Sequence, residues 1–133
     1  MSKLFFKDLL IEKDGIIKGP FGGDIKKSLF VPKTDSTYKV YEQGIALKKD
    51  ISYGEYYISE EHFQKSLSRF EVKQGDILMT GAGTLGELFV VPKNYPRGVI
   101  NQALLRIRLN EDVIDKIYFK YFFKYNRRKK KME

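Results

Sequence analysis

Short apolar runs that end at glycine or proline are the feature of this 133-residue chain that most limits its fold. Leu88 to Val91 runs into Pro92, and Ile77 to Met79 is followed two residues later by Gly81. Runs of about four to eight residues bounded by such breakers are typical of strands, whereas buried helices need about 10 to 12 residues. The sequence therefore predicts an α/β protein of the α+β kind, with a mixed, mostly antiparallel sheet and short helices.

Composition supports one folded domain and excludes several kinds of site. Apolar residues make up 42% of the chain and aromatic residues 14%, enough to bury a core. The chain has no Cys and one His, which excludes a Cys/His zinc site, a disulfide framework and a thiolate nucleophile. The apolar runs fall well short of the roughly 18 residues that cross a membrane. We expect a cytoplasmic protein without metal, cofactor or membrane contact.

The charge of the chain favours a polyanionic partner. The net charge is +8 and the pI about 9.5, and each Lys or Arg placed on a phosphate can release a counterion. Residues 127–133 form a basic tail that carries +4 of this charge, so residues 1–126 carry the other +4. A terminal basic run is often only a solubilising tail, so sequence-specific binding has to come from the folded body.

Several elements are predicted in the first half of the chain. An amphipathic element is expected at 4–11, followed by a turn and a strand at Ile16 to Lys18. Gly19 to Gly23 should form a fixed loop around a buried Phe21, and Asp24 should cap a helical turn that runs through Phe30. A strand is expected at Tyr38 to Val40, and Gly44 to Leu47 could form a second strand.

In the second half of the chain, the sequence predicts one helix, three strands and a terminal helix. Ser59 can cap a helix through Arg69, with Phe63 and Leu67 facing inward. The expected strands run over 76–80, 88–92 and 99–109, and the last should have one core face and one largely polar face. An amphipathic helix is expected at 113–126. The predicted domain therefore covers residues 1–112.

The segment from Lys48 to Tyr57 is the leading predicted contact region, because it mixes lysines with three tyrosines around Gly54. Lysine and arginine hold phosphates, while tyrosine can contact sugar, phosphate or base. The residues expected to contact DNA are Lys26, Lys27, Lys33, Lys48, Lys49, Tyr53, Tyr56, Tyr57, Lys65, Arg69, Thr80 and Thr84. No catalytic residue and no metal ligand is expected.

Asn101, Gln102, Arg106 and Arg108 also belong to the side-chain types that read adenine and guanine edges in the major groove. Each of them could instead serve in capping or in an ion pair. His62 has no second His at ligand spacing, which favours a structural role.

Two short patterns offer alternatives. Gly81 to Gly86 matches the dinucleotide pattern G-x-G-x-x-G, but that fingerprint needs a helix to follow, and here a strand is predicted. Glu71 and Lys73 match the E-x-K half of a magnesium-dependent nuclease site, for which Asp35 or Asp50 would have to supply the other carboxylate.

Three segments together resemble the target recognition domain of a type I restriction-modification specificity subunit. They are 15–27 (GIIKGPFGGDIKK), 75–86 (GDILMTGAGTLG) and 98–108 (GVINQALLRIR). The resemblance spans nearly the whole chain, in the same order and spacing. It implies a module that reads one half of a split DNA site, while methyltransferase and restriction subunits supply the chemistry. It also implies that the shared motifs hold the scaffold and that the bases are read from 31–69, with help from 81–86.

The chain departs from that family in two respects. Family subunits usually carry two recognition domains joined by long helices, whereas this chain has one domain and a terminal helix that stops near Asn126. It therefore resembles a half subunit or a fragment. Gly81 and Ala82 stand where the family often has Arg or Ser.

Several functions stay open at this stage beside sequence-specific DNA recognition. The chain could dock on restriction-modification subunits as an interaction protein or silent specificity cassette, or pair with a second copy, through the helix at 113–126. A small nuclease built on Asp50, Glu71 and Lys73 is a further alternative. Binding of single-stranded nucleic acid on the tyrosines is the weakest.

Overall fold

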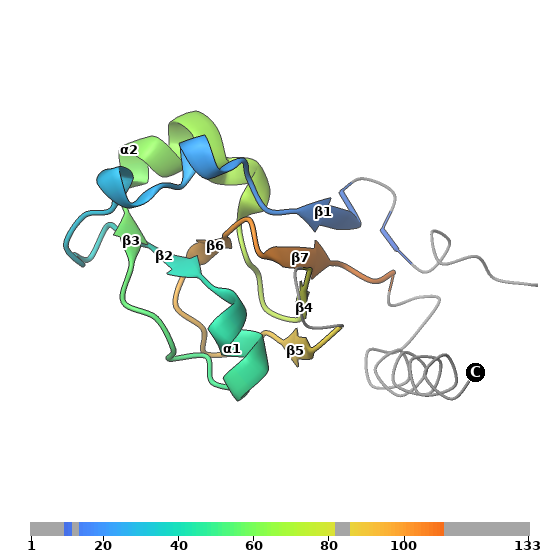
Figure 1. The fold of residues 1–133 in the computed structure, drawn as a ribbon. Coiled ribbons are helices and arrows are strands. Elements are labelled where there is room, and N and C mark those ends of the chain that lie inside the picture. The colour runs from blue at the N-terminus through green and yellow to red at the C-terminus, as the bar shows by residue number, and fades with distance from the viewer. Residues whose placement is uncertain (1–9, 12–13, 82–85, 111–133) are drawn as a thin grey trace, which may run out of the picture.

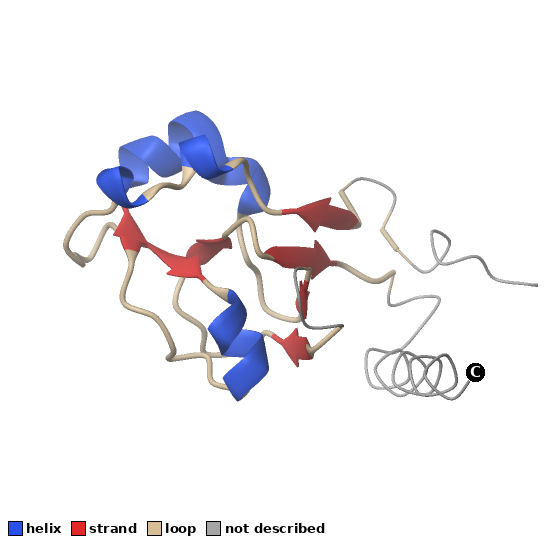
Figure 2. Ribbon diagram, viewed as in Figure 1, coloured by secondary structure: helices blue, strands red, loops and turns tan. Residues whose placement is uncertain are grey.

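The computed structural model describes residues 10–11, 14–81 and 86–110 (Figure 1). Several predicted features lie outside these residues: nearly all of the element at 4–11, Thr84, the helix at 113–126 and the basic tail. Within the described part, two small sheets carry short helical segments (Figure 2). The predicted α+β class with a mixed, mostly antiparallel arrangement is confirmed.

The larger sheet contains the strands β1 (Ile16–Lys18), β7 (Leu104–Ile107), β4 (Ile77–Thr80) and β5 (Leu88–Val90) in that spatial order, all antiparallel. The predicted strands around 16–18, 76–80 and 88–92 are thereby confirmed. The last strand in sequence, β7, lies between the first, β1, and β4.

The smaller sheet has the order β3 (Tyr57–Ile58), β2 (Tyr38–Tyr41) and β6 (Gly98–Ile100). β2 pairs with β3 antiparallel and with β6 parallel. A Cβ on Gly98 would lie 2.2 Å from the Lys39 carbonyl oxygen, so glycine permits the close approach of these two strands.

The single strand predicted at 99–109 is wrong, because the chain changes sheets between β6 and β7. The side chain of Asn101 accepts a hydrogen bond from the backbone N–H of Ala103 at 3.0 Å, closing a tight turn. Asparagine favours such turns, and a pattern of period two does not reveal one inside an apolar stretch.

β7 is also buried on both of its faces, so the predicted polar face is wrong. Arg106 is 1% exposed, and one of its terminal nitrogens donates to the carbonyl oxygens of Arg69 and Glu71 at 2.9 and 2.8 Å. Arg108 donates from Nε and a terminal nitrogen to the two carboxylate oxygens of the buried Asp76, at 2.7 and 3.1 Å. Both arginines are therefore structural, which was one of the two roles that the sequence allowed.

The residues from Gly44 to Leu47 form part of a helix and not the second strand that was considered. Helix α1 spans Gln43–Lys48 and ends at Lys49, whose φ of 54° places it in the left-handed region. Within this helix, Ile45 and Ala46 are buried. A four-residue apolar run fits either a strand or a buried helical turn, and here the turn packs against the core.

The prediction of a buried Phe21 is wrong, because this ring is 87% exposed. The loop is followed by two single 3₁₀ turns, Gly22–Asp24 and Lys27–Leu29, and the Asp24 side chain caps neither of them. Ile25 takes the buried position instead. The flanking glycines let the chain project the ring outward at little steric cost.

The helix predicted from Ser59 to Arg69 is confirmed, although its turns vary. α2 (Glu60–His62) continues through a π-helical turn, Phe63–Leu67, and a 3₁₀ turn, Ser68–Phe70. The Ser59 hydroxyl accepts a hydrogen bond from the His62 backbone N–H at 3.1 Å, as a capping residue should. Phe63 and Leu67 are buried, and Phe63 stacks on Tyr38 with ring centroids 3.8 Å apart.

The helical segments cover opposite faces of the smaller sheet (Figure 1). Tyr38 and Val40 pack with Phe63 and Leu67, whereas Tyr41 packs with Ile45 of α1. The alternation of side chains along β2 thus feeds two parts of the core. None of the helices in the described part of the chain has the length and the hydropathy of a membrane-spanning segment.

Candidate nucleic-acid interface

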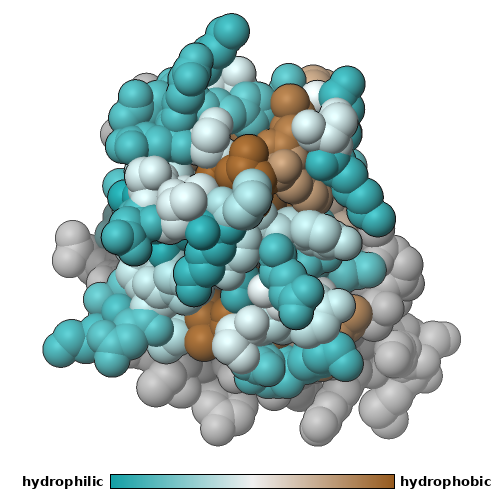
Figure 3. Space-filling model, turned by 90° about the vertical axis from the view of Figure 1, so that its left-hand side faces the viewer, coloured by the Kyte–Doolittle hydropathy of each residue, from teal (hydrophilic) through white to brown (hydrophobic). Residues whose placement is uncertain are grey.

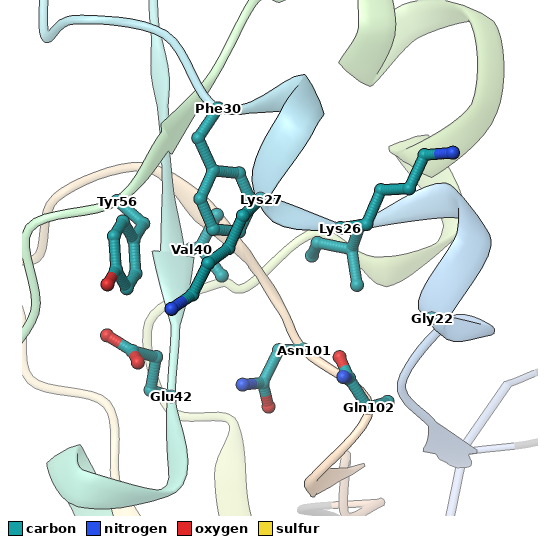
Figure 4. Close-up of a pocket in the computed structure, with 10 residues that line it drawn as sticks. Gly22, Lys26, Lys27, Phe30, Val40, Glu42, Tyr56, Asn101 and Gln102 are labelled. Carbon is teal, nitrogen blue, oxygen red and sulfur yellow. The ribbon is translucent and has the colours of Figure 1, made fainter.

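A hollow of about 240 Å³ lies where several chain segments meet, and it contains three of the residues predicted to contact DNA (Figure 4). These three are Lys26, Lys27 and Tyr56. The other residues that line it are Gly22, Ile25, Phe30, Val40, Glu42, Asn101 and Gln102.

Aromatic and basic groups form one side of this hollow. The rings of Phe30 and Tyr56 lie 4.8 Å apart, and the ammonium group of Lys27 lies 5.9 Å from the Tyr56 ring centre. In Figure 4 the Lys27 side chain points to the space between Tyr56 and Glu42, while Lys26 extends away from the hollow. The hollow therefore offers one cation inside and one at its edge.

Two amide side chains, Asn101 and Gln102, border the opposite side (Figure 4). The sequence marked them as suited to base reading, but they were not among the predicted contact residues. Gly19 packs closely against the turn that carries them, because a Cβ at Gly19 would lie 1.7 Å from the Asn101 carbonyl oxygen. The first and third of the motifs that resemble specificity subunits therefore meet at the hollow.

Sequence reasoning missed Glu42 altogether. This residue precedes α1 without capping it, and its carboxylate makes no hydrogen bond within the described part of the chain. Partial burial raises the pKa of Glu42, while nearby Lys39 and Lys27 act to lower it. The only sequence signal was its place at the end of a strand, where functional side chains are often found.

Two other predicted lysines also lie near aromatic rings. Lys33 is 5.7 Å from the ring centre of Tyr57, and Lys48 is 5.7 Å from that of Tyr53. Tyr53 is half-buried and packs against the core, and a Cβ on Gly44 would lie 2.2 Å from its ring. Tyr53 therefore anchors the 48–57 segment to the core, and its ring is only partly open to a partner.

The remaining predicted contact residues have varied surroundings. Lys49 pairs with Glu87 at 3.3 Å and donates to the Leu88 carbonyl, which anchors the end of α1 on β5. Thr80 is buried, and its hydroxyl accepts a hydrogen bond from the Glu87 backbone at 3.1 Å, so it offers no surface contact.

Lys65 and Arg69 are exposed on the segment that follows α2. Arg69 pairs with Asp14 at 3.4 Å, and more than half of its side chain stays open to solvent. These two cations are available to a partner, but they do not line the hollow.

The residues of the nuclease alternative have structural contacts. The Asp50 carboxylate accepts hydrogen bonds from the backbone and the hydroxyl of Ser52, at 2.9 and 2.6 Å, and these bonds lower the pKa of Asp50. At Glu71 it is the backbone carbonyl, and not the carboxylate, that accepts hydrogen bonds from Arg106 and Arg108. Within the described ranges, no group of three or more His, Cys, Asp or Glu side chains could hold a metal ion.

Two other sequence patterns have structural explanations. The His62 ring nitrogen Nε2 lies 2.7 Å from the Asp24 carbonyl oxygen and ties the helix to the 3₁₀ turns. Gly81 to Gly86 joins β4 to β5, which pair antiparallel, so a strand follows it as expected and not the helix of a dinucleotide site.

Figure 3 shows the end of the molecule where β3 and the 31–37 loop lie at the left of Figure 1. Hydrophilic side chains cover most of this face, and the hydrophobic ones show only in small separate areas. Such a face suits a wet, polar partner better than a large apolar interface.

Comparison of the sequence with known protein-family models gives no match, and comparison with curated proteins gives none.

Proposed function

We propose that this chain is a sequence-specific double-stranded DNA recognition module that performs no chemistry itself. The observation that carries the proposal is the hollow, where two lysines, a tyrosine and two amides from distant parts of the chain come together. Lysines bind phosphates without regard to sequence, whereas amides can distinguish base edges in the major groove. One small surface thus holds both kinds of contact that a DNA reader needs.

The resemblance to type I specificity subunits extends this proposal. The module would read one half of a split site, and methyltransferase and restriction subunits would be its partners. A chain that only docks on those subunits, as an interaction protein or silent cassette, should retain no particular duplex sequence.

The test is a selection of randomised duplex DNA by the purified chain at low and at higher salt. Phosphate contacts weaken steeply as salt rises, whereas base contacts keep their preference. We expect a short enriched motif of about three to five base pairs, within the span that one small domain covers. Retention without any motif would overturn the proposal.

A charge-matched pair of variants locates the phosphate contacts. Lys26→Ala with Lys27→Ala should lower the slope of log affinity against log salt by roughly 1.8, because each phosphate contact contributes about 0.9. The control removes the exposed Lys73 and Lys93, which do not line the hollow. Equal losses in both variants would indicate general charge attraction and not a located interface.

A further inference from the structure

Three polar side chains in the hollow have hydrogen-bonding groups without a partner in the described residues. They are the Glu42 carboxylate, the Asn101 amide nitrogen and the whole amide of Gln102. A carboxylate only accepts hydrogen bonds, and an amide nitrogen only donates them. The hollow therefore offers an acceptor and a donor to a ligand at the same time.

The strand pairing fixes two of these groups next to each other. Tyr41 and Ile100 are paired residues of the parallel strands β2 and β6, and Glu42 and Asn101 are the residues that follow them. The backbone N–H of Asn101 also donates to the Tyr41 carbonyl at 3.0 Å. Glu42 and Asn101 thus stand at the carboxyl ends of neighbouring parallel strands, a common place for ligand sites in open sheets.

The turn at Asn101 settles which of its atoms faces the hollow. Its side-chain oxygen is held by the Ala103 backbone at 3.0 Å, which leaves the nitrogen to donate. In Figure 4 this nitrogen points to the side of the hollow where Glu42 lies. Gln102 is exposed beside it and can both donate and accept.

An acceptor beside a donor matches only some base edges. In the major groove, adenine and cytosine carry an amino group that donates, whereas guanine and thymine present only acceptors. The adenine amino group lies beside the N7 acceptor, and the cytosine amino group lies beside the O6 acceptor of its paired guanine. A carboxylate at this place would leave a guanine or thymine oxygen facing negative charge.

We propose that Glu42, Asn101 and Gln102 read one base pair through the exocyclic amino group of an adenine or cytosine, while Lys27 holds a neighbouring phosphate. This inference rests on the proposed function. It differs from what the resemblance implies, because two of the three side chains come from a motif that the resemblance assigns to the scaffold.

The test compares the wild-type chain with Glu42→Gln in the same randomised duplex selection. Glutamine keeps the size of the side chain but can also donate, so guanine and thymine become acceptable. We expect one motif position in the wild type to distinguish a base pair from its inverse, A·T from T·A or C·G from G·C, because the amino group lies on only one side of the pair. This preference should fall by roughly 5-fold to 150-fold in the variant, the range of a hydrogen-bonded base contact. The other positions should keep their preferences.

Glu55→Gln is the matched control, because Glu55 is exposed, close in sequence to Tyr56 and outside the hollow. It removes the same charge, so it should raise overall affinity slightly without changing the motif. Gln102→Ala is a second test on an exposed side chain that has no hydrogen bond in the described residues, and it should weaken the preference at the same or an adjacent position. If Glu42→Gln fails to fold, the result for Gln102→Ala alone decides whether the hollow reads a base pair.

The outcomes separate the two proposals. A wild-type motif that both Glu42→Gln and Gln102→Ala leave unchanged would overturn this inference and leave the proposed function in place. An equal loss of preference at every motif position in Glu42→Gln would overturn it as well, because the inference assigns Glu42 to one base pair. Absence of any wild-type motif would overturn the proposed function, and this inference with it.

Discussion

Two regions of this molecule use similar residues in opposite ways. Beside β4 and β7, the buried Asp76 and Arg106 and the half-buried Arg108 all have partners: Arg108 donates to Asp76, and both arginines donate to backbone carbonyls. At the hollow, Lys27, Glu42 and Gln102 lie close together, yet no hydrogen bond or ion pair joins them within the described residues. The comparison shows that residue type does not decide whether a charged group serves the fold or a partner. What decides is whether neighbouring groups already satisfy it.

The largest expected effect is at the buried network. Asp76→Ala should destabilise the fold by about 3 to 5 kcal/mol, because it removes the buried carboxylate that accepts from the half-buried Arg108 and from the Lys73 backbone N–H. Thermal or urea denaturation measures the loss. Asp35→Ala, which removes an exposed carboxylate, should change stability by less than about 0.5 kcal/mol. Similar midpoints for the two variants would mean that the Asp76–Arg108 pair contributes little.

Gly19 connects the first motif to the hollow, so its replacement should affect both the fold and binding. In Gly19→Ala the new methyl group would overlap the Asn101 carbonyl, and the loop would have to move away. We expect a loss of about 1 to 3 kcal/mol, typical of overpacking, together with a weaker DNA motif. Gly23→Ala is the control, since a Cβ there meets nothing within 4 Å and Gly23 does not line the hollow. Unchanged binding by a folded Gly19→Ala would separate the hollow from recognition.

Phe21 tests whether exposed apolar surface near the hollow serves a partner. Phe21→Ala removes a ring that is 87% exposed, so the fold should lose little. If the proposed function holds and this ring contacts the duplex, DNA affinity should fall at least roughly 5-fold, about what partial burial of a Phe side chain contributes. Leu47 is also exposed and apolar but lies on α1, and Leu47→Ala should leave affinity unchanged. Equal affinity for both variants and the wild type would exclude a role for Phe21 in binding.

The smallest expected effect on stability is at Gln102. This side chain is exposed and makes no hydrogen bond in the described part of the chain, so Gln102→Ala should shift stability by less than about 0.5 kcal/mol. Denaturation of the variant beside Asp76→Ala measures the contrast between the two regions directly. A loss above 1 kcal/mol would show that Gln102 belongs to the fold, as the arginines of β7 do.

Local pattern was enough to predict the elements that depend on neighbouring residues. β1, β4 and β5 follow from short apolar runs between breakers, and the Ser59 cap follows from its place before two glutamates. Local pattern failed where distant contacts decide. The turn at Asn101 depends on Gly19 and Tyr41, and α1 is a helix because Ile45 reaches the core that Leu78 and Leu104 share.

The candidate site was less predictable than the fold, for a physical reason. Lys26, Lys27 and Tyr56 were predicted because lysines and tyrosines are suited to DNA, wherever they lie. Glu42 and the amides become partners of these residues only through the parallel pairing of β2 with β6, which joins residues nearly 60 positions apart. No periodicity within one segment contains that information. Thr80 and Lys49 show the converse, since suitable side chains were already engaged by the fold.

The parallel pair also governs the order in which this chain can fold. β2 cannot pair with β6, nor β1 with β7, until the later strand has been synthesised, because β6 and β7 lie near the far end of the described chain. At a synthesis rate of about 5 to 20 residues per second, the nearly 60 residues between the paired strands take roughly 3 to 12 seconds to emerge. During that interval the early strands have open edges, and β7 enters between two strands that came before it. Closure of the larger sheet is therefore a late event on the ribosome, and such non-local pairing makes for slow folding.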